Sequence, residues 1–350
     1  MALIGSLNSG ISALRNFARG LEVIGNNIAN VNSTAFKSSR TKYTDTFSQF
    51  LKQPATSPTD GNGSNSPASQ IGLGVNISGV QTSFLQGSLT TTGQATDLAI
   101  SGNGFFQLRN AQNNQLYATR AGDFRTDDRG YLTSNDGFRL QGLTGGYASY
   151  VAGVDTAGKL TFTKTVHPDT SAGEDFTTGD LQIDFNPSFA NGRITNTPDA
   201  SGNLVLTDAN GVDYTFSSDQ VLAKVPKMLS FSFLKNGDLS VSLDNGDSFV
   251  GGRVLLMDFR DPTALVHEGS NLFTGVDAAG IVGNLKMDAT NNTPGGYGLG
   301  TIQGNTLELS NVDLTEEFSN MITTQRSFQA GSRIITVSDD ILNEVVNLKR

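Results

Sequence analysis

Residues 26–37 of the chain read NNIANVNSTAFK, with four asparagines in the first seven positions and no charged residue before Lys37. An amphipathic stretch precedes this segment, and a long run rich in Ser, Thr, Gly and Asn follows it. Asparagine tolerates the left-handed backbone conformation and bonds to its own main chain, so such clusters commonly end helices. The segment therefore predicts the end of an N-terminal helix. Two interpretations of its amides stay open, an ordinary helix cap or a set of side chains that bridge neighbouring subunits.

The residues before the amide cluster predict one long helix, because apolar residues recur there at a 3-4 spacing for nearly four heptads. The other face carries only Arg15, Arg19 and Glu22 as charged side chains. A solvated helix face usually carries more charge, so we expect this face to contact protein as well. The stripe positions that we expect to pack are Ile4, Leu7, Ile11, Leu14, Leu21 and Ile28.

The C-terminal residues predict a second helix with a heptad pattern. Asp313 and Glu316 form a candidate capping pair at its start, and Lys349 and Arg350 lie in its last turn, where the helix dipole favours positive charge. The apolar positions that we expect to pack are Leu314, Phe318, Met321, Phe328, Ile335, Leu342 and Val345. Two alternatives follow for the helices, a simple hairpin that joins the termini or self-assembly through them.

The chain between the two helices predicts β-structure. Hairpin-type turns recur at 135–137, 210–211, 236–237 and 245–246, each with Asn and Gly. Alternating apolar residues flank one of these turns, at Leu229, Phe231 and Phe233 and then at Leu239, Val241 and Leu243. We therefore expect a meander or barrel-like β-fold.

The expected fold class is α+β and mainly β, with the terminal helices paired as a coiled coil. Low-complexity residues 57–69 predict a mobile connector, and the glycines at 142–146 predict a flexible join. The expected domains are a helical tube-forming domain (1–32 and 308–350), a connector (33–72), a split middle β-domain (73–146 and 253–307) and an inserted outer β-domain (147–252).

Composition excludes most binding and catalytic chemistry. The net charge is −9, with 24 basic and 33 acidic residues, which disfavours nucleic-acid binding. No cysteine is present, and the only two histidines, His167 and His267, lie a hundred positions apart. Metalloprotease, nucleophile-elbow and phosphate-loop motifs are absent from the sequence. We therefore expect no enzyme activity, cofactor, metal or small-molecule substrate. We also expect no membrane span and no cleaved signal peptide.

Four segments in order resemble the bacterial flagellar rod and hook protein family. They are NNIANVNSTAFK (26–37), GSLTTTGQATDLAISGNGFFQL (87–108), YATRAGDFRTDDRGYLTSNDGFRLQG (117–142) and SNVDLTEEFSNMITTQRSFQAGSRIITVSDDILNEVVNLKR (310–350). The resemblance implies an amide signature at Asn27, Asn30, Asn32, Thr34 and Phe36. Hook subunits resemble the chain most, because the residues near 147–252 fill the place of their inserted domain.

The resemblance also implies a role and a location. The chain is expected to polymerise with itself into a curved, flexible tube that links the rod to the filament, transmits torque and encloses the export channel. Implied partners are the rod protein, the hook cap, the hook–filament junction proteins and the type III export apparatus. The expected location is the extracellular flagellar hook. Two alternatives remain, a distal rod protein of the basal body and, from another class, an extracellular β-rich adhesin with a terminal coiled coil.

Overall fold

The computed structural model describes residues 2–54, 67–167, 176–183, 193–282 and 291–348. The described chain is mainly β, with a long helix at each end, and it divides into two compact units. The first unit contains residues 1–85 and 310–350, and the second contains residues 86–309. The expected low-complexity connector at 57–69 falls largely on residues outside the described part of the chain.

The first unit contains the two terminal helices, α1 (Ala2–Ala29) and α3 (Leu314–Leu348), as the apolar repeats predict. Asp313 caps α3, since its Oδ1 accepts hydrogen bonds from the main-chain nitrogens of Thr315 (2.8 Å) and Glu316 (3.3 Å). The expected basic residues at the end of α3, Lys349 and Arg350, lie outside the described residues.

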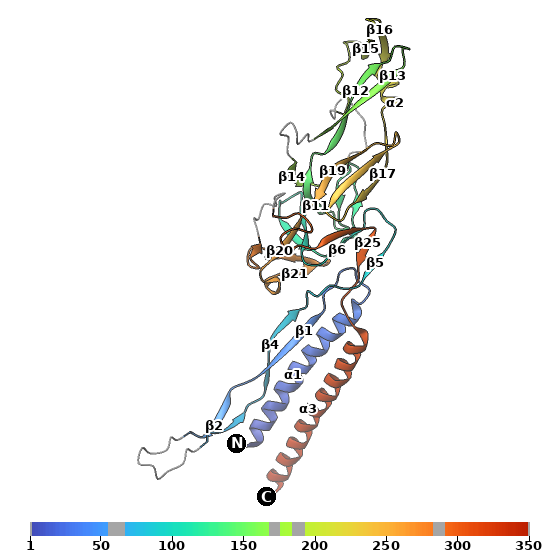
Figure 1. The fold of residues 1–350 in the computed structure, drawn as a ribbon. Helices are drawn as coiled ribbons and strands as arrows, with labels where there is room; N and C mark the ends of the chain where they lie inside the picture. Colours follow the sequence, from blue (N-terminus) through green and yellow to red (C-terminus); the bar gives the residue numbers. More distant parts are fainter. Residues whose placement is uncertain (1, 55–66, 168–175, 184–192, 283–290, 349–350) are drawn as a thin grey trace, which may run out of the picture. The chain divides into compact units, whose positions relative to one another are not determined.

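A β-ribbon completes the first unit. Strand β1 (Ser39–Asp45) pairs antiparallel with β4 (Val75–Thr82), and β2 (Ser48–Lys52) pairs with β3 (Ser69–Gly72). The structure thus differs from the expectation of a connector at 33–72. Residues 39–45, 48–52 and 69–72 of this range form paired strands, and the described part of the range belongs to the same compact unit as the terminal helices (Figure 1).

The second unit is built around one large antiparallel sheet, with the central order β17-β18-β19-β11-β7-β8-β22-β21. The strands of this order are β7 (Phe105–Arg109), β8 (Leu116–Thr119), β11 (Arg139–Thr144), β17 (Met228–Phe233), β18 (Asp238–Leu243), β19 (Ser248–Val254), β21 (Val266–Gly269) and β22 (Leu272–Thr274). Attached to it are β9 (Arg125–Thr126), β10 (Leu132–Thr133), β14 (Thr177–Asp180), β20 (Leu256–Phe259) and β23 (Ile281–Val282).

Smaller pairs complete the second unit. They are β5 (Leu89–Thr91) with β25 (Thr306–Glu308), β6 (Leu98–Ser101) with β24 (Thr301–Gly304), β12 (Tyr147–Val154) with β13 (Leu160–His167), and β15 (Asn203–Thr207) with β16 (Asp213–Ser217). A short helix, α2 (Ser218–Lys224), follows β16, and a 3-10 turn spans Pro262–Ala264. The segments before and after the middle of the chain therefore meet in shared sheets.

The expected end of the inserted domain at residue 252 is not a boundary in the structure. Strands β17, β18, β19 and β14 join the same sheet as β7, β8 and β11. Asp180 on β14 accepts hydrogen bonds from Arg109, Arg139 and Gln141. Burial raises the pKa of Asp180, but these bonds outweigh it and hold the pKa below its ordinary value. Among the described residues of 147–252, the hairpins β12/β13 and β15/β16, with α2, stand outside this sheet.

The predicted turns are confirmed, but the alternation predicted for one neighbouring strand is interrupted. Gly137, Gly211, Gly237 and Gly246 all have positive φ, between +83° and +86°, as the Asn-containing turns predict. Strand β17, however, has an irregular register between Met228 and Ser230. The irregularity interrupts the alternation, so Leu229 is 74% exposed although it was expected on the buried face.

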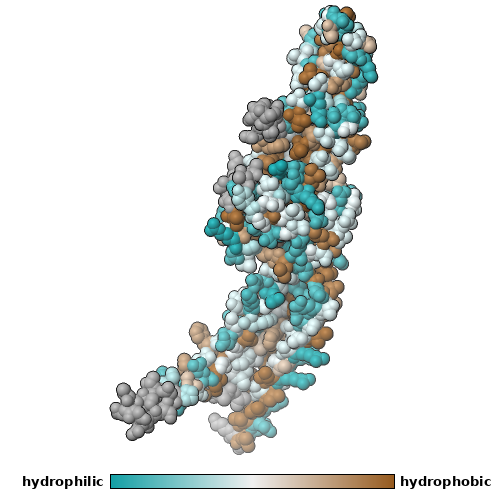
Figure 2. Space-filling model, in the orientation of Figure 1, coloured by the Kyte–Doolittle hydropathy of each residue, from teal (hydrophilic) through white to brown (hydrophobic). Residues whose placement is uncertain are grey.

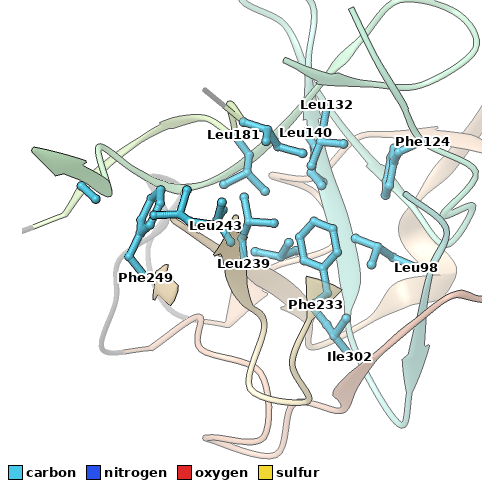
Figure 3. Packing of buried hydrophobic residues seen from close by; sticks show 14 of the residues in the cluster. Leu98, Phe124, Leu132, Leu140, Leu181, Phe233, Leu239, Leu243, Phe249 and Ile302 are labelled. Carbon is cyan, nitrogen blue, oxygen red and sulfur yellow. The ribbon is translucent and has the colours of Figure 1, made fainter. Parts of the chain in front are cut away.

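The core of the second unit is made by residues from both sides of the middle segment (Figure 3). Leu98, Leu132 and Leu140 are fully buried and converge on Phe233, Leu239 and Ile302. Phe105 and Phe106 are also buried in β7, as expected of strand core. The second unit thus encloses one contiguous hydrophobic core.

Two glycines at 142–146 are explained by close approach of main chains. A Cβ at Gly142 would lie 2.3 Å from the Arg253 carbonyl oxygen, and one at Gly146 would lie 2.2 Å from the Val250 carbonyl oxygen. Side chains cannot fit at either position without a shift of strand β19. Packing against β19 therefore accounts for these glycines, in place of the flexible join that their composition suggested.

Candidate assembly site

The two terminal helices lie antiparallel along one another. Ser6 Oγ lies 3.5 Å from Ser338 Oγ near one end of the pair, and Asn27 bonds to Glu317 near the other end. Between these ends Gly10 and Gly331 lie side by side, and an added Cβ at Gly10 would lie 3.2 Å from Ile335 Cγ1 and 3.6 Å from the Gly331 carbonyl oxygen. Small residues therefore let the helices come close, with large apolar side chains beside them.

The side of α1 next to the one that faces α3 is covered by the β1/β4 ribbon. Asn16, 7% exposed, donates from Nδ2 to the Val75 carbonyl oxygen at 2.6 Å. Phe17 and Tyr43 make an edge-to-face contact with ring centroids 5.8 Å apart, and the Tyr43 hydroxyl occupies the space beside Gly20. The face of α1 that carries Arg15, Arg19 and Glu22 is exposed in the described chain, so a protein contact for this face stays a prediction.

Asn27 is the buried member of the amide cluster, at 1% exposure. Its Nδ2 donates to the Ser39 carbonyl oxygen and to Glu317 Oε1, both at 2.8 Å, and its Oδ1 accepts from the Ser39 nitrogen at 3.0 Å. Both amide hydrogens are therefore used within the chain. Asn27 ties together the end of α1, the start of β1 and the first turn of α3.

The other signature residues have more local roles. Asn30 Nδ2 donates to the Asn26 carbonyl oxygen at 2.9 Å, which fits an ordinary helix end, and Asn32 is exposed. Thr34 is partly buried, and Phe36 is buried beside Ala35, whose φ of +55° is unusual for a residue other than glycine. The cluster thus combines a cap with one buried amide.

Asn311 is a further anchor that the sequence analysis missed. Its Nδ2 donates to the carbonyl oxygens of Ser83 (2.9 Å) and Leu85 (3.1 Å), and its Oδ1 accepts from the Ser38 nitrogen at 2.7 Å. Asn311 therefore holds the segments that precede β1 and follow β4 beside the start of α3. A lone asparagine before a helix gives no sequence signal for such distant partners.

The predicted packing positions divide into covered and uncovered sets. Leu7, Ile11, Leu14, Leu21 and Ile28 of α1 are partly buried, and so are Met321 and Ile335 of α3. The side chain of Ile4 lies outside the described part of the chain. The remaining predicted positions of α3 are exposed: Leu314 (38%), Phe318 (49%), Phe328 (37%), Leu342 (41%) and Val345 (52%).

Helix geometry explains this division. A straight helix of about 3.6 residues per turn drifts by roughly 20° per heptad against a seven-residue repeat. From Leu314 to Leu342 the repeat therefore moves by about 80° across the side of α3 that faces α1, and it does not form one straight seam. Helix α3 has 35 residues against 28 in α1, so its C-terminal end also extends past Ala2. Figure 2 shows hydrophobic side chains at the surface along the helices.

Glu317 gives the helix pair a titratable contact. Burial raises its pKa above the ordinary 4.5 and nearby Glu316 adds to the rise, while the bond from Asn27 and the charge of Arg40 oppose it. Between the ordinary and the raised pKa, the folded chain holds a proton that the unfolded chain has lost. The contribution of Glu317 to stability therefore grows as the pH falls from neutral into this window.

We expect Glu317→Gln to remove this pH dependence. The difference in unfolding free energy between the wild type and the variant should shift in favour of the wild type as the pH is lowered towards 4.5. Thermal unfolding followed by helical circular dichroism at several pH values measures it. Glu344→Gln, at an exposed position of α3, is the matched control. A pH-independent difference for Glu317→Gln would contradict the prediction.

No group of three or more His, Cys, Asp or Glu side chains that could hold a metal ion occurs among the described residues. Likewise, none of the described helices has the length and apolar character needed to cross a membrane. The first unit instead presents exposed apolar positions of α3, which can pack against other protein chains.

Three family models match the chain. A model described as flagella basal body rod protein matches residues 7–37, the flagellar hook protein FlgE/F/G D1 domain matches 99–186, and the flagellar basal body rod FlgEFG protein C-terminal model matches 303–348. The first and third matches contain most of α1 and α3.

Proteins of known class are similar over nearly the whole chain. The flagellar basal-body rod protein FlgG of Bacillus subtilis is 31% identical over 348 positions, covering 99% of this chain and all of that protein. The flagellar hook protein FlgE of Borreliella burgdorferi is 28% identical over 446 positions, with coverage of 99% and 100%. That of Salmonella typhimurium is 26% identical over 434 positions, with coverage of 98% and 100%.

One solved structure is similar in part. The crystal structure of the Helicobacter pylori flagellar hook protein FlgE2 aligns with a TM-score of 0.34 and 10% identity. The alignment covers 63% of this chain and all of that one.

Proposed function

Since the chain belongs to the family of bacterial flagellar hook and rod proteins, which are structural and not enzymatic, we propose that it is a subunit of the flagellar hook. The subunits polymerise helically into a flexible, curved tube between the basal-body rod and the filament. The tube transmits torque and encloses the channel for exported subunits. The observation that carries the proposal is full-length similarity to hook proteins, together with a terminal helix that leaves large apolar side chains uncovered.

The faces of α3 suit a position in the inner wall of such a tube. At about 3.6 residues per turn, Arg326, Arg333 and Glu344 fall on the side of α3 that points away from α1. All three are exposed and charged. A polar side of this kind can border a water-filled channel, while α1 covers the opposite side of α3.

The partners and the location of the proposed subunit follow from the same role. Its partners are copies of itself, the rod protein, the hook cap, the hook–filament junction proteins and the type III export apparatus. Its location is the extracellular hook, reached through that apparatus. Bending of the tube comes from sliding between neighbouring subunits.

A distal rod protein is the second candidate, and two observations favour it. The rod protein of Bacillus subtilis is 31% identical to the chain, above the identity of the hook proteins named above. Alignments with hook proteins also span 433 to 477 positions against the 350 residues of this chain, so those proteins contain segments that it lacks. The middle segment, with its two separate hairpins and α2, favours the hook instead.

Deletion of the chain in its own bacterium distinguishes the candidates. For a hook subunit, basal bodies purified from the deletion strain should retain rods of wild-type length and lack the curved extension. For a rod subunit, the rods themselves should be shortened. Electron microscopy of the basal bodies measures both. Intact hooks and rods in the deletion strain would overturn both candidates.

A further inference from the structure

The uncovered apolar side chains of α3 lie on two different sides of the helix. In its N-terminal half, Leu314, Phe318 and Ile322 are 38%, 49% and 53% exposed. At about 3.6 residues per turn they fall within roughly a quarter of a turn of one another. We call this set the N-half face. Its residues lie to one side of the line that contacts α1, which contains Glu317, Met321 and Gly331.

The C-terminal half of α3 has its apolar side chains on the other side. Val337, Ile341 and Val345 are 55%, 42% and 52% exposed, and Leu348 continues the row at 86%. We call these four residues the C-half face. Their helical angles lie about half a turn from those of the N-half face. The uncovered apolar surface therefore changes sides near the middle of α3.

Polar residues occupy the complementary positions on each half. In the N-terminal half, Glu316 and Thr323 lie on the side that carries the C-half face further along. In the C-terminal half, Thr336 and Asn343 lie on the side of the N-half face. Phe328, Leu342 and Val346 are also exposed, but they fall near the line that faces α1. Away from that line each described half carries its exposed apolar row on one side, and exposed apolar rows mark sites of protein contact.

From this arrangement we infer that α3 joins two different neighbouring copies, with the N-half face of one copy packed against the C-half face of the next. The inference rests on the proposed function, because it requires that copies of the chain polymerise. A contact between like faces would be two-fold symmetric and would close after two copies. A contact between unlike faces leaves one of each free at the ends and continues into an open helical polymer.

The two faces also fit one another by their placement along the helix. They occupy the two halves of a 35-residue helix, which is about 50 Å long at 1.5 Å per residue. A stagger of about half that length between adjacent copies places the N-terminal half of one α3 beside the C-terminal half of the next. The N-half face of one copy and the C-half face of the next are then buried in the same contact, and the polar side of α3 stays exposed to solvent.

Cysteine crosslinking tests the inference, because the chain contains no natural cysteine. Ile322→Cys places a thiol on the N-half face and Ile341→Cys places one on the C-half face. Polymers are formed from each variant alone and from their mixture, and then treated with a short bismaleimide. We expect crosslinked dimers in the mixture and their loss in either variant alone. Arg333→Cys, on the polar side of α3, is the control and should not crosslink with either variant.

Each other outcome overturns the inference in a recognisable way. Crosslinking of a single variant with itself, as strong as in the mixture, would show a contact between like faces. Polymers that form without crosslinks in the mixture would show that the two faces do not meet. If the wild-type chain itself forms no polymer by electron microscopy, the proposed function fails and the inference fails with it.

A pair of blocked variants covers the case in which the cysteine variants do not polymerise. Ile322→Glu blocks only the N-half face and Ile341→Glu blocks only the C-half face. Each variant alone should stay monomeric, and an equal mixture should form a one-to-one dimer, because one intact face of each kind remains. Analytical ultracentrifugation measures this. A mixture that stays monomeric would overturn the inference.

Discussion

Replacement of Arg120 by methionine is expected to lower the unfolding free energy of the second unit by about 3–5 kcal/mol. Arg120 and Glu308 form a buried ion pair, with side chains 4% and 0% exposed and Nη1 lying 3.5 Å from Oε2. Without the guanidinium, the Glu308 carboxylate would remain buried and would lose the positive charge that pairs with it. The loss of one partner from a buried pair costs more than the pair itself contributes, because the remaining charge has no access to water.

The position of this pair explains why its loss should affect the whole unit. Glu308 ends β25, close to the exit of the chain from the second unit, and its Oε1 accepts from the Gly87 nitrogen at 2.8 Å near the entry. Arg120 follows β8 and lies over the ring of Phe105, with its Cζ 5.2 Å from the ring centroid. Burial lowers the pKa of Arg120, and the charge of Glu308 opposes that shift. The pair thus joins segments from both sides of the middle segment.

Chemical denaturation followed by tyrosine fluorescence measures the effect, since the chain has no tryptophan. The double variant with Arg120→Met and Glu308→Gln is the control. Glutamine keeps an acceptor for the Gly87 nitrogen but carries no charge, so the double variant should be more stable than Arg120→Met alone. Equal stabilities of the single and double variants would show that the unpaired charge is not the cause. Wild-type stability of Arg120→Met would contradict the prediction itself.

Local sequence was enough to predict the terminal helices and the turns. The start of α3 follows from Asp313, whose side chain caps the first turn. The turn at Asn236-Gly237 follows from the positive φ that glycine accepts. These features depend on residues a few positions apart, and the sequence contains that information directly.

The partners of the helices could not be predicted in the same way. Strand β1, SRTKYTD, has no apolar alternation, so nothing in it indicated a ribbon that would cover α1. The heptad repeat of α3 suggested one continuous seam, but Phe318 and Val345 lie on the two flanks of the line that faces α1 and are exposed. Contacts such as that between Asn27 and Glu317 join residues 290 positions apart, and periodicity carries no information on them.

Replacement of Asn27 by leucine is expected to destabilise the first unit by about 2–4 kcal/mol, because three hydrogen bonds are lost at a buried site. Leucine is similar in size but neither donates nor accepts. The nitrogen and carbonyl oxygen of Ser39 and the Glu317 carboxylate would then lose their partner. An unsatisfied buried polar group costs more than an intact bond contributes, and a charged group costs most.

The same substitution at Asn30 supplies a matched control within the amide cluster. Asn30 bonds locally to Asn26 and Ser33 at an exposed helix end, so Asn30→Leu should cost only about 0.5–1 kcal/mol. The midpoint of thermal loss of helical circular dichroism measures both variants, on the isolated chain and on the assembled polymer. Similar losses for the two variants would contradict the anchoring role of Asn27. If Asn30→Leu lowered the midpoint more than Asn27→Leu only in the polymer, Asn30 would be a residue that bridges neighbouring subunits. Neighbouring copies are present only in the polymer.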